Sequence, residues 1–157
     1  MKLNALKICG LAILLLLSAC AVPPEKPPEL SRQAVVDALP GAVISEDGLT
    51  ISYPGNNLFA EGSVLPLPGG MTALEPLVNL LNTTRQFKVL VAVRSSGHTE
   101  EYDKVLATKR MQLLETIFIN RGLEEERLQM SVATEAGAPL ELVLQPLSAE
   151  SSSGEKR

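Results

Sequence analysis

The stretch from residue 87 to residue 122 decides the fold, and it reads FKVLVAVRSSGHTEEYDKVLATKRMQLLETIFINRG. In residues 87–93 large apolar side chains alternate, and most of the side chains between them are apolar too, which is typical of an interior β-strand. A polar turn, RSSGHT, follows at residues 94–99. Apolar residues then recur at helical spacing from Glu100 to Asn120, and Arg121-Gly122 is a typical helix end. The stretch therefore predicts a strand, a polar turn and a long helix.

The predicted helix has a charged residue on its apolar side. At 100° per residue, one broad apolar arc contains Tyr102, Val105, Leu106, Leu113, Leu114 and Ile117. Arg110 falls inside this arc, and a buried guanidinium needs partners, so Arg110 either pairs with an acid or marks a site at the edge of the core. Because long side chains on helices lean toward the N-terminus, it leans toward Asp103 and residues 97–100. The alternative is an arginine that extends along its own apolar stem to water.

The first 19 residues have the pattern of a signal peptide. Lys2 and Lys7 precede an apolar run of about ten residues, which is too short to span a bilayer as a helix. The run ends in Leu17-Ser18-Ala19-Cys20, which resembles the lipobox of bacterial lipoproteins. That resemblance implies cleavage before Cys20, attachment of diacylglycerol to its thiol and acylation of the new amino terminus. Ala21-Val22 in place of an aspartate implies sorting to the outer membrane. The alternative is an ordinary secretory signal with an incidental cysteine.

Composition bounds the rest of the chain. Residues 20–41 are rich in proline and predict a stiff tether after the lipidated cysteine, although a short helix at residues 32–39 is also expected. Residues 42–147 are expected to form one domain, and residues 148–157 a polar, disordered tail. Without Lys2 and Lys7, the 14 basic residues fall to 12 against 18 acidic ones, a formal net charge of −6. An acidic protein with two Tyr, three Phe and no Trp is a poor candidate for nucleic-acid binding.

Further elements flank the central stretch. A hairpin is expected at residues 43–53 around Asp47-Gly48, and a helix capped by Thr72 is expected to end at residues 82–84. Residues 123–127 read as a polar connector, and residues 128–133 and 140–146 as the last strands. This order predicts an α/β sandwich in which two helices pack on one face of a mixed β-sheet.

Three stretches resemble the OmpA-like C-terminal domain family of OmpA, Pal and MotB. They are Leu58–Ser63 with Pro68 and Gly70, Val91–Thr99 ending in Gly-His-Thr, and Tyr102–Arg110. The connector at residues 121–128 fits the family as well. Together they extend over residues 49–147, and the resemblance implies the βαβαββ arrangement of that family.

The resemblance also implies a ligand. The family binds peptidoglycan non-covalently, with a turn aspartate on the ammonium and a helix arginine on the carboxylate of the stem peptide's diaminopimelate. Arg110 stands at the arginine position, and the candidate site is Thr99, Glu100, Asp103 and Arg110. The turn is shorter than in the family, and residues 135–142 lack its asparagines and arginines. Glu100 or Asp103 therefore either receives the ammonium, pairs with Arg110 or stabilises the helix N-terminus.

The remaining motifs point away from catalysis. His98 is the sole histidine, and no Ser-His-acid set or metal-ligand spacing is legible, so we expect no enzyme, no metal and no cofactor. Two hypotheses follow. In the first, an outer-membrane lipoprotein binds peptidoglycan and links the membrane to the cell wall. In the second, a degenerate OmpA-like domain acts as a protein-interaction module or structural subunit of an envelope assembly.

Overall fold

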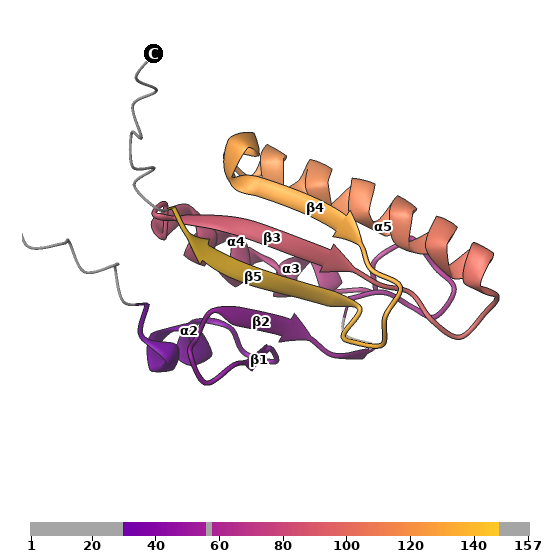
Figure 1. Ribbon diagram of the computed structural model, residues 1–157, viewed down its shortest axis with the longest axis horizontal. Helices are drawn as coiled ribbons and strands as arrows, with labels where there is room; N and C mark the ends of the chain where they lie inside the picture. The colour runs from indigo at the N-terminus through magenta and orange to yellow at the C-terminus, as the bar shows by residue number, and fades with distance from the viewer. Residues whose placement is uncertain (1–29, 56–57, 148–157) are drawn as a thin grey trace, which may run out of the picture.

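The computed structural model describes residues 30–55 and 58–147 (Figure 1). The predicted signal peptide, Cys20, the first part of the tether and the tail lie outside the described residues. In the part of the chain that is described, no helix combines the length and the apolar character needed to cross a bilayer.

The centre of the molecule is a five-stranded mixed sheet in the order β1-β2-β5-β3-β4. The strands are β1 (Val43–Ile44), β2 (Thr50–Tyr53), β3 (Phe87–Val93), β4 (Leu128–Val132) and β5 (Leu140–Pro146). β3 and β4 run parallel, and every other neighbouring pair is antiparallel. The expected hairpin is β1 and β2, and β3 is an interior strand as expected, between β5 and β4.

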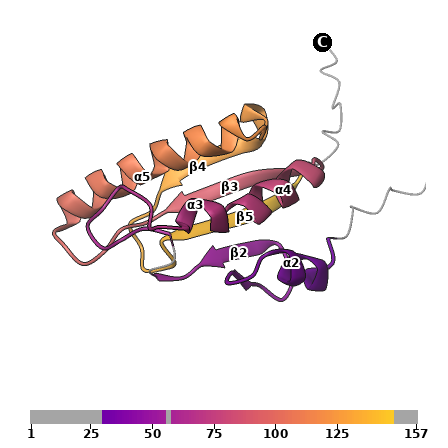
Figure 2. The same ribbon diagram turned by 180° about the vertical axis from the view of Figure 1, so that it is seen from behind.

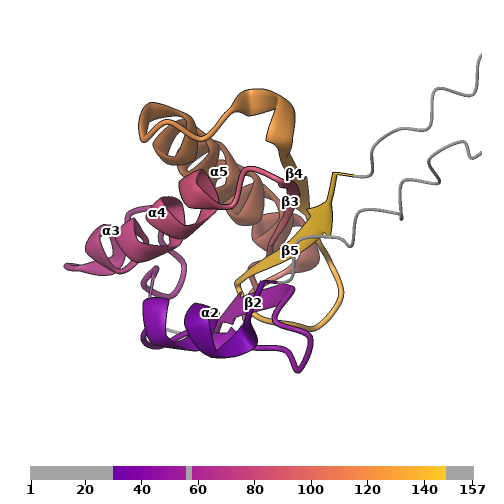
Figure 3. The same ribbon diagram turned by 90° about the vertical axis from the view of Figure 1, so that its left-hand side faces the viewer.

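The helices cover one face of this sheet. They are α2 (Arg32–Ala38), α3 (Gly70–Ala73), α4 (Glu75–Thr83) and α5 (Glu100–Asn120), and a 3-10 turn, η2, spans Glu125–Arg127. Seen along the strands, α3, α4 and α5 lie on the same side of the sheet, and the view from behind has them in front of it (Figures 2 and 3). The predicted fold class, with two main helices on one face of a mixed sheet, is confirmed; α2 and α3 add two short helices to it.

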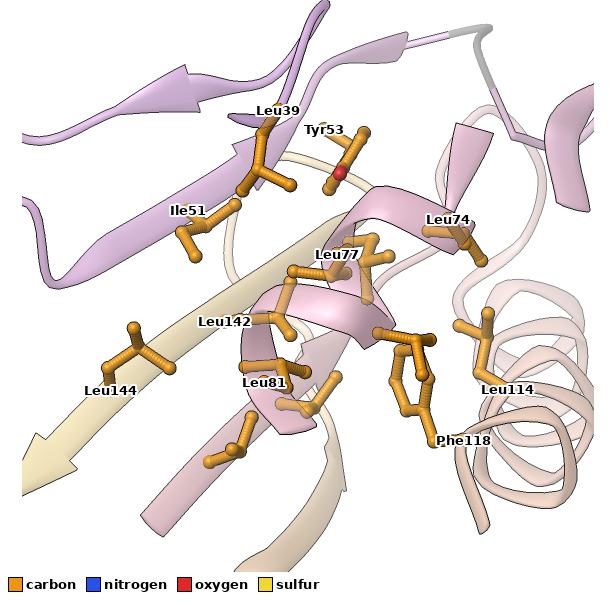
Figure 4. Close-up of a cluster of buried hydrophobic side chains, with 14 of the residues drawn as sticks. Leu39, Ile51, Tyr53, Leu74, Leu77, Leu81, Leu114, Phe118, Leu142 and Leu144 are labelled. Carbon is orange, nitrogen blue, oxygen red and sulfur yellow. The ribbon is translucent and has the colours of Figure 1, made fainter. Parts of the chain in front are cut away.

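The hydrophobic core fills the space between α4, α5 and the sheet. Leu77 and Leu81 of α4 lie toward Leu142 of β5, while Leu114 and Phe118 come from α5 (Figure 4). All five side chains are fully buried. The predicted arc on α5 is therefore only partly right.

The error in that arc lies at the start of α5. Tyr102 and Val105 are 46% and 49% exposed, whereas Phe118, outside the predicted arc, is buried. The reason is geometric: the first turns of α5 extend past the ends of the strands, so no sheet lies beneath them (Figure 1). Four of the five buried residues of α5 are spaced four apart, at Leu106, Arg110, Leu114 and Phe118, and the fifth is Ala107.

Of three other local expectations, two differ from the structure and one is confirmed. Thr72 does not cap a helix, because the chain first makes the short turn of α3 and α4 then begins after Leu74, without a side-chain cap. The helix expected within the proline-rich range forms as α2, and its Val35 and the adjacent Leu39 are buried in the core. The connector after α5 is not wholly polar or solvated, because it contains buried Leu123 as well as buried Arg127.

Candidate functional site

An open pocket of about 680 Å³ lies beyond the carboxyl end of β3. Three segments and one helix form it: the loop after β2 (residues 55 and 59–62), the turn after β3 (94–97), the loop between β4 and β5 (134–137 and 139), and Arg110 of α5. The pocket walls thus come from loops that are far apart in sequence. The central stretch supplies two of the parts: the turn after β3 and Arg110 of α5.

Arg110 connects α5 to the loop after β2. It is only 6% exposed; its Nε donates to Ser63 O at 2.8 Å and its Nη2 to Ala60 O at 2.9 Å. The guanidinium carbon lies 4.8 Å from the centre of the Phe59 ring, within cation–π distance. Burial lowers the pKa of Arg110, and the negative charge of Asp103 opposes that shift, so the group stays charged at neutral pH.

These contacts choose between the sequence-based alternatives for Arg110. Among the described residues, no carboxylate lies within ion-pair distance of it, and its side chain does not extend to open water. Two of its five N–H groups are used by backbone carbonyls. Within residues 30–55 and 58–147, Arg110 therefore neither pairs with an acid nor extends to water. It is tied to the 60–63 loop at the edge of the core, and its other N–H groups make no hydrogen bond to the described residues.

A second arginine lines the pocket. Arg94 follows β3 directly; its Nη1 donates to Ala138 O at 3.2 Å, and its Nη2 lies 3.5 Å from a carboxylate oxygen of Glu141. Gly137 packs against the guanidinium so closely that a Cβ there would lie 2.9 Å from its carbon. Arg94 thus braces the β4–β5 loop. The sequence analysis did not single it out, although a charged residue directly after a buried strand was a usable signal.

The turn before α5 is held by its own side chains. Thr99 caps the helix, because its hydroxyl accepts from Tyr102 N at 3.3 Å. Asp103 accepts from the Ser95 hydroxyl at 3.2 Å and from His98 N at 3.1 Å, and the His98 ring lies 3.4 Å from it. Both oxygens of Asp103 are thereby occupied, and His98 acts as a turn residue.

Comparison with solved structures places this arrangement among known folds. The periplasmic domain of Helicobacter pylori MotB superposes with a TM-score of 0.56 at 13% identity, over 70% of this chain and 85% of that one. The cell wall anchor of the T6SS from Pseudomonas aeruginosa gives 0.55 at 14% identity, over 78% and 99%. The OmpA-like domain of FopA1 from Francisella tularensis gives 0.50 at 15% identity, over 78% and 96%.

The chain has an OmpA-like fold. At these identities the likeness establishes the fold alone. No protein-family model matches the sequence, and no curated protein matches it.

Within this fold, the predicted site residues lie apart. Arg110 lines the pocket, whereas Thr99, Glu100 and Asp103 do not. Glu100 is exposed in the first turn of α5. The carboxylates that do line the pocket are Glu61 and Glu135, from loops that the sequence analysis did not connect with Arg110.

Across residues 30–55 and 58–147, no three His, Cys, Asp or Glu side chains gather closely enough to hold a metal ion. Two guanidinium groups, of Arg94 and Arg110, and two carboxylates, of Glu61 and Glu135, line the pocket. Such a surface suits a ligand that carries both signs of charge.

Proposed function

We propose that this protein is an outer-membrane lipoprotein whose OmpA-like domain lies in the periplasm and binds peptidoglycan non-covalently, so that it links the membrane to the cell wall. The observation that carries the proposal is Arg110, held in an open pocket with unused N–H donors. The fold of a solved cell wall anchor, from the Pseudomonas system, supports it.

The ligand group that fits is the carboxylate of diaminopimelate in the stem peptide. A guanidinium offers a planar pair of donors that matches a carboxylate, and burial beside Phe59 fixes the plane of Arg110. Side-chain entropy lost on binding is small because Arg110 is already ordered by two hydrogen bonds. In this proposal the domain binds the ligand and does not alter it chemically.

Sedimentation with purified cell-wall sacculi tests the binding. The full chain, purified in mild detergent, is expected to sediment with sacculi, and Arg110→Ala to weaken binding at least tenfold, because one charge-assisted hydrogen bond contributes about 1.5–3 kcal/mol. Arg85→Ala is the matched control, since the Arg85 side chain is 74% exposed and its one ion pair, with Glu124, lies outside the pocket. Sedimentation that is indifferent to Arg110, with circular dichroism showing a folded variant, would exclude this site.

The membrane anchor is tested separately. Mass spectrometry of the mature protein is expected to find an amino-terminal Cys20 that carries a diacylglyceryl group and an acyl chain. Such a modification anchors a protein almost permanently, because each buried methylene contributes about 0.8 kcal/mol. Cys20→Ala is expected to release the protein from outer-membrane fractions. An unmodified mature terminus, or membrane association that survives Cys20→Ala, contradicts the lipoprotein assignment.

One observation favours the second candidate function, a protein-interaction module. The exposed first turns of α5 present Tyr102 and Val105, at 46% and 49% exposure, and the Tyr102 hydroxyl donates to Gly62 O at the pocket. Aromatic and aliphatic side chains at such a position are typical of protein contacts. A chain that fails to sediment with sacculi, yet co-purifies with a stoichiometric envelope protein only when Tyr102 and Val105 are intact, would support this function instead.

A further inference from the structure

The acid that completes the pocket does not come from the turn before α5. Both carboxylate oxygens of Asp103 already accept hydrogen bonds from Ser95 and His98, and Thr99 caps the helix. Neither residue lines the pocket, and neither does Glu100. A ligand ammonium seated beside Arg110 therefore needs another negative group.

Glu61 lies on the segment that Arg110 itself holds. The two hydrogen bonds of Arg110 end on Ala60 O and Ser63 O, on either side of Glu61 and Gly62. The Tyr102 hydroxyl adds a third bond, to Gly62 O at 3.1 Å. Three hydrogen bonds from α5 thus fix the backbone that carries Glu61. Because two of them come from Arg110, Arg110 itself holds the Glu61 segment in place.

The Glu61 carboxylate faces the turn across the pocket. A Cβ built on Gly97 would lie 3.5 Å from Glu61 Oε1, so the carboxylate reaches the backbone of that turn. Gly97 has a φ of +108°, a conformation that favours glycine. Among the described residues, no cation lies within ion-pair distance of Glu61. Its charge is therefore available to a ligand.

We propose that Glu61 receives the ammonium of the ligand while Arg110 receives its carboxylate, so that the pocket recognises a zwitterionic amino-acid side chain. This inference rests on the proposed peptidoglycan binding and names the acid of its clamp. A zwitterion is selected when an acid and a base stand at a fixed separation, and the Arg110 bonds to both ends of the 60–63 segment supply that separation. Glu135 lines the pocket on the β4–β5 loop, without a comparable tie to Arg110.

The test compares two soluble probes on the full chain in detergent. The first probe is a disaccharide-tetrapeptide with diaminopimelate, and the second is the same molecule with its side-chain amine acetylated. Calorimetric titration of the wild-type protein is expected to give at least tenfold tighter binding of the first probe, the difference that about 1.4 kcal/mol produces. Glu61→Gln, which keeps the shape of the side chain, is expected to bring the ratio of the two affinities close to one. Glu126→Gln is the matched control and keeps the wild-type ratio, because Glu126 is exposed and does not line the pocket. Glu135→Gln tests the other carboxylate of the pocket.

Each outcome decides a separate point. Equal binding of both probes by the wild-type protein, or a preference that survives Glu61→Gln, overturns the role of Glu61 but leaves peptidoglycan binding intact. Loss of the preference in Glu135→Gln instead assigns the ammonium to the other loop and also overturns it. If neither probe binds and the chain does not sediment with sacculi, the proposed function fails and the role of Glu61 fails with it.

Discussion

Replacing Arg127 with methionine should destabilise the domain severely, although the residue lies far from the pocket. Arg127 is only 5% exposed, and it donates to three backbone carbonyls: Phe87 O at 3.0 Å, Leu81 O at 3.0 Å and Thr84 O at 2.9 Å. It thereby joins the end of α4, the start of β3 and the turn before β4. Burial lowers the pKa of Arg127, and nearby Glu124 opposes the shift, so the cation persists.

The magnitude follows from those three bonds. A hydrogen bond to a charged group contributes about 1.5–3 kcal/mol, but three bonds from one group are not additive. We therefore expect Arg127→Met to lower the free energy of unfolding by about 4 kcal/mol. For a domain of this size that corresponds to a drop in melting temperature of roughly 10–20 °C.

Urea denaturation followed by circular dichroism measures the change. Arg85→Met is the matched control, because the Arg85 side chain is 74% exposed, and its one ion pair, 3.3 Å from Glu124, should contribute less than about 1 kcal/mol. Arg127→Lys should fall between the two, since an ammonium cannot span three carbonyls in one plane. A loss below about 1 kcal/mol in Arg127→Met would refute the reasoning, because it would mean that the three carbonyls find other donors without cost.

Three further outcomes are expected. Gly70→Ala should lower the urea midpoint by an amount equivalent to about 1–3 kcal/mol, because its Cβ would lie 2.7 Å from Leu58 O; an unchanged midpoint would contradict that clash. Thr99→Ala should cost about 1 kcal/mol through the lost cap, with Thr99→Ser restoring it and sedimentation with sacculi unaffected in both. Burial raises the pKa of Tyr53 to about 12, whereas the pKa of a tyrosine in the unfolded chain is about 10. The stability that this difference contributes is therefore complete below a pH of about 10 and is lost as the pH rises toward 12. Tyr53→Phe should remove that alkaline loss of stability, as measured by urea denaturation across this pH range.

Local signals were sufficient for the elements of the central stretch. The limits of β3 and α5 agree with the prediction because each is set by neighbours in sequence: alternating apolar residues for the strand, and Thr99 and Gly122 at the helix ends. The first hairpin is local as well. Asp47 accepts from Leu49 N at 2.9 Å, and Gly48 has a φ of +74°, as its turn requires.

Long-range partners were out of reach of the same reasoning. Arg127 follows three glutamates and reads as part of a solvated connector, yet its acceptors lie 40–46 residues earlier in the chain. The position of β5 between β2 and β3 is equally non-local. Periodicity reports which face of an element is apolar, and it carries no information on which segment supplies the partner.

The same limit explains why the candidate site was only partly found. Arg110 was identified because a cation on an apolar helical arc is visible in the sequence, whereas the acid beside it was sought in the turn that precedes α5. In the structure the Asp103 carboxylate is already used within that turn, because it accepts hydrogen bonds from Ser95 and His98. The 60–63 loop instead reaches the pocket because Arg110 binds its carbonyls. A turn too short to bring an acid to a ligand therefore does not exclude the proposed site, because Arg110, the proposed ligand contact, also holds a second acidic loop in place.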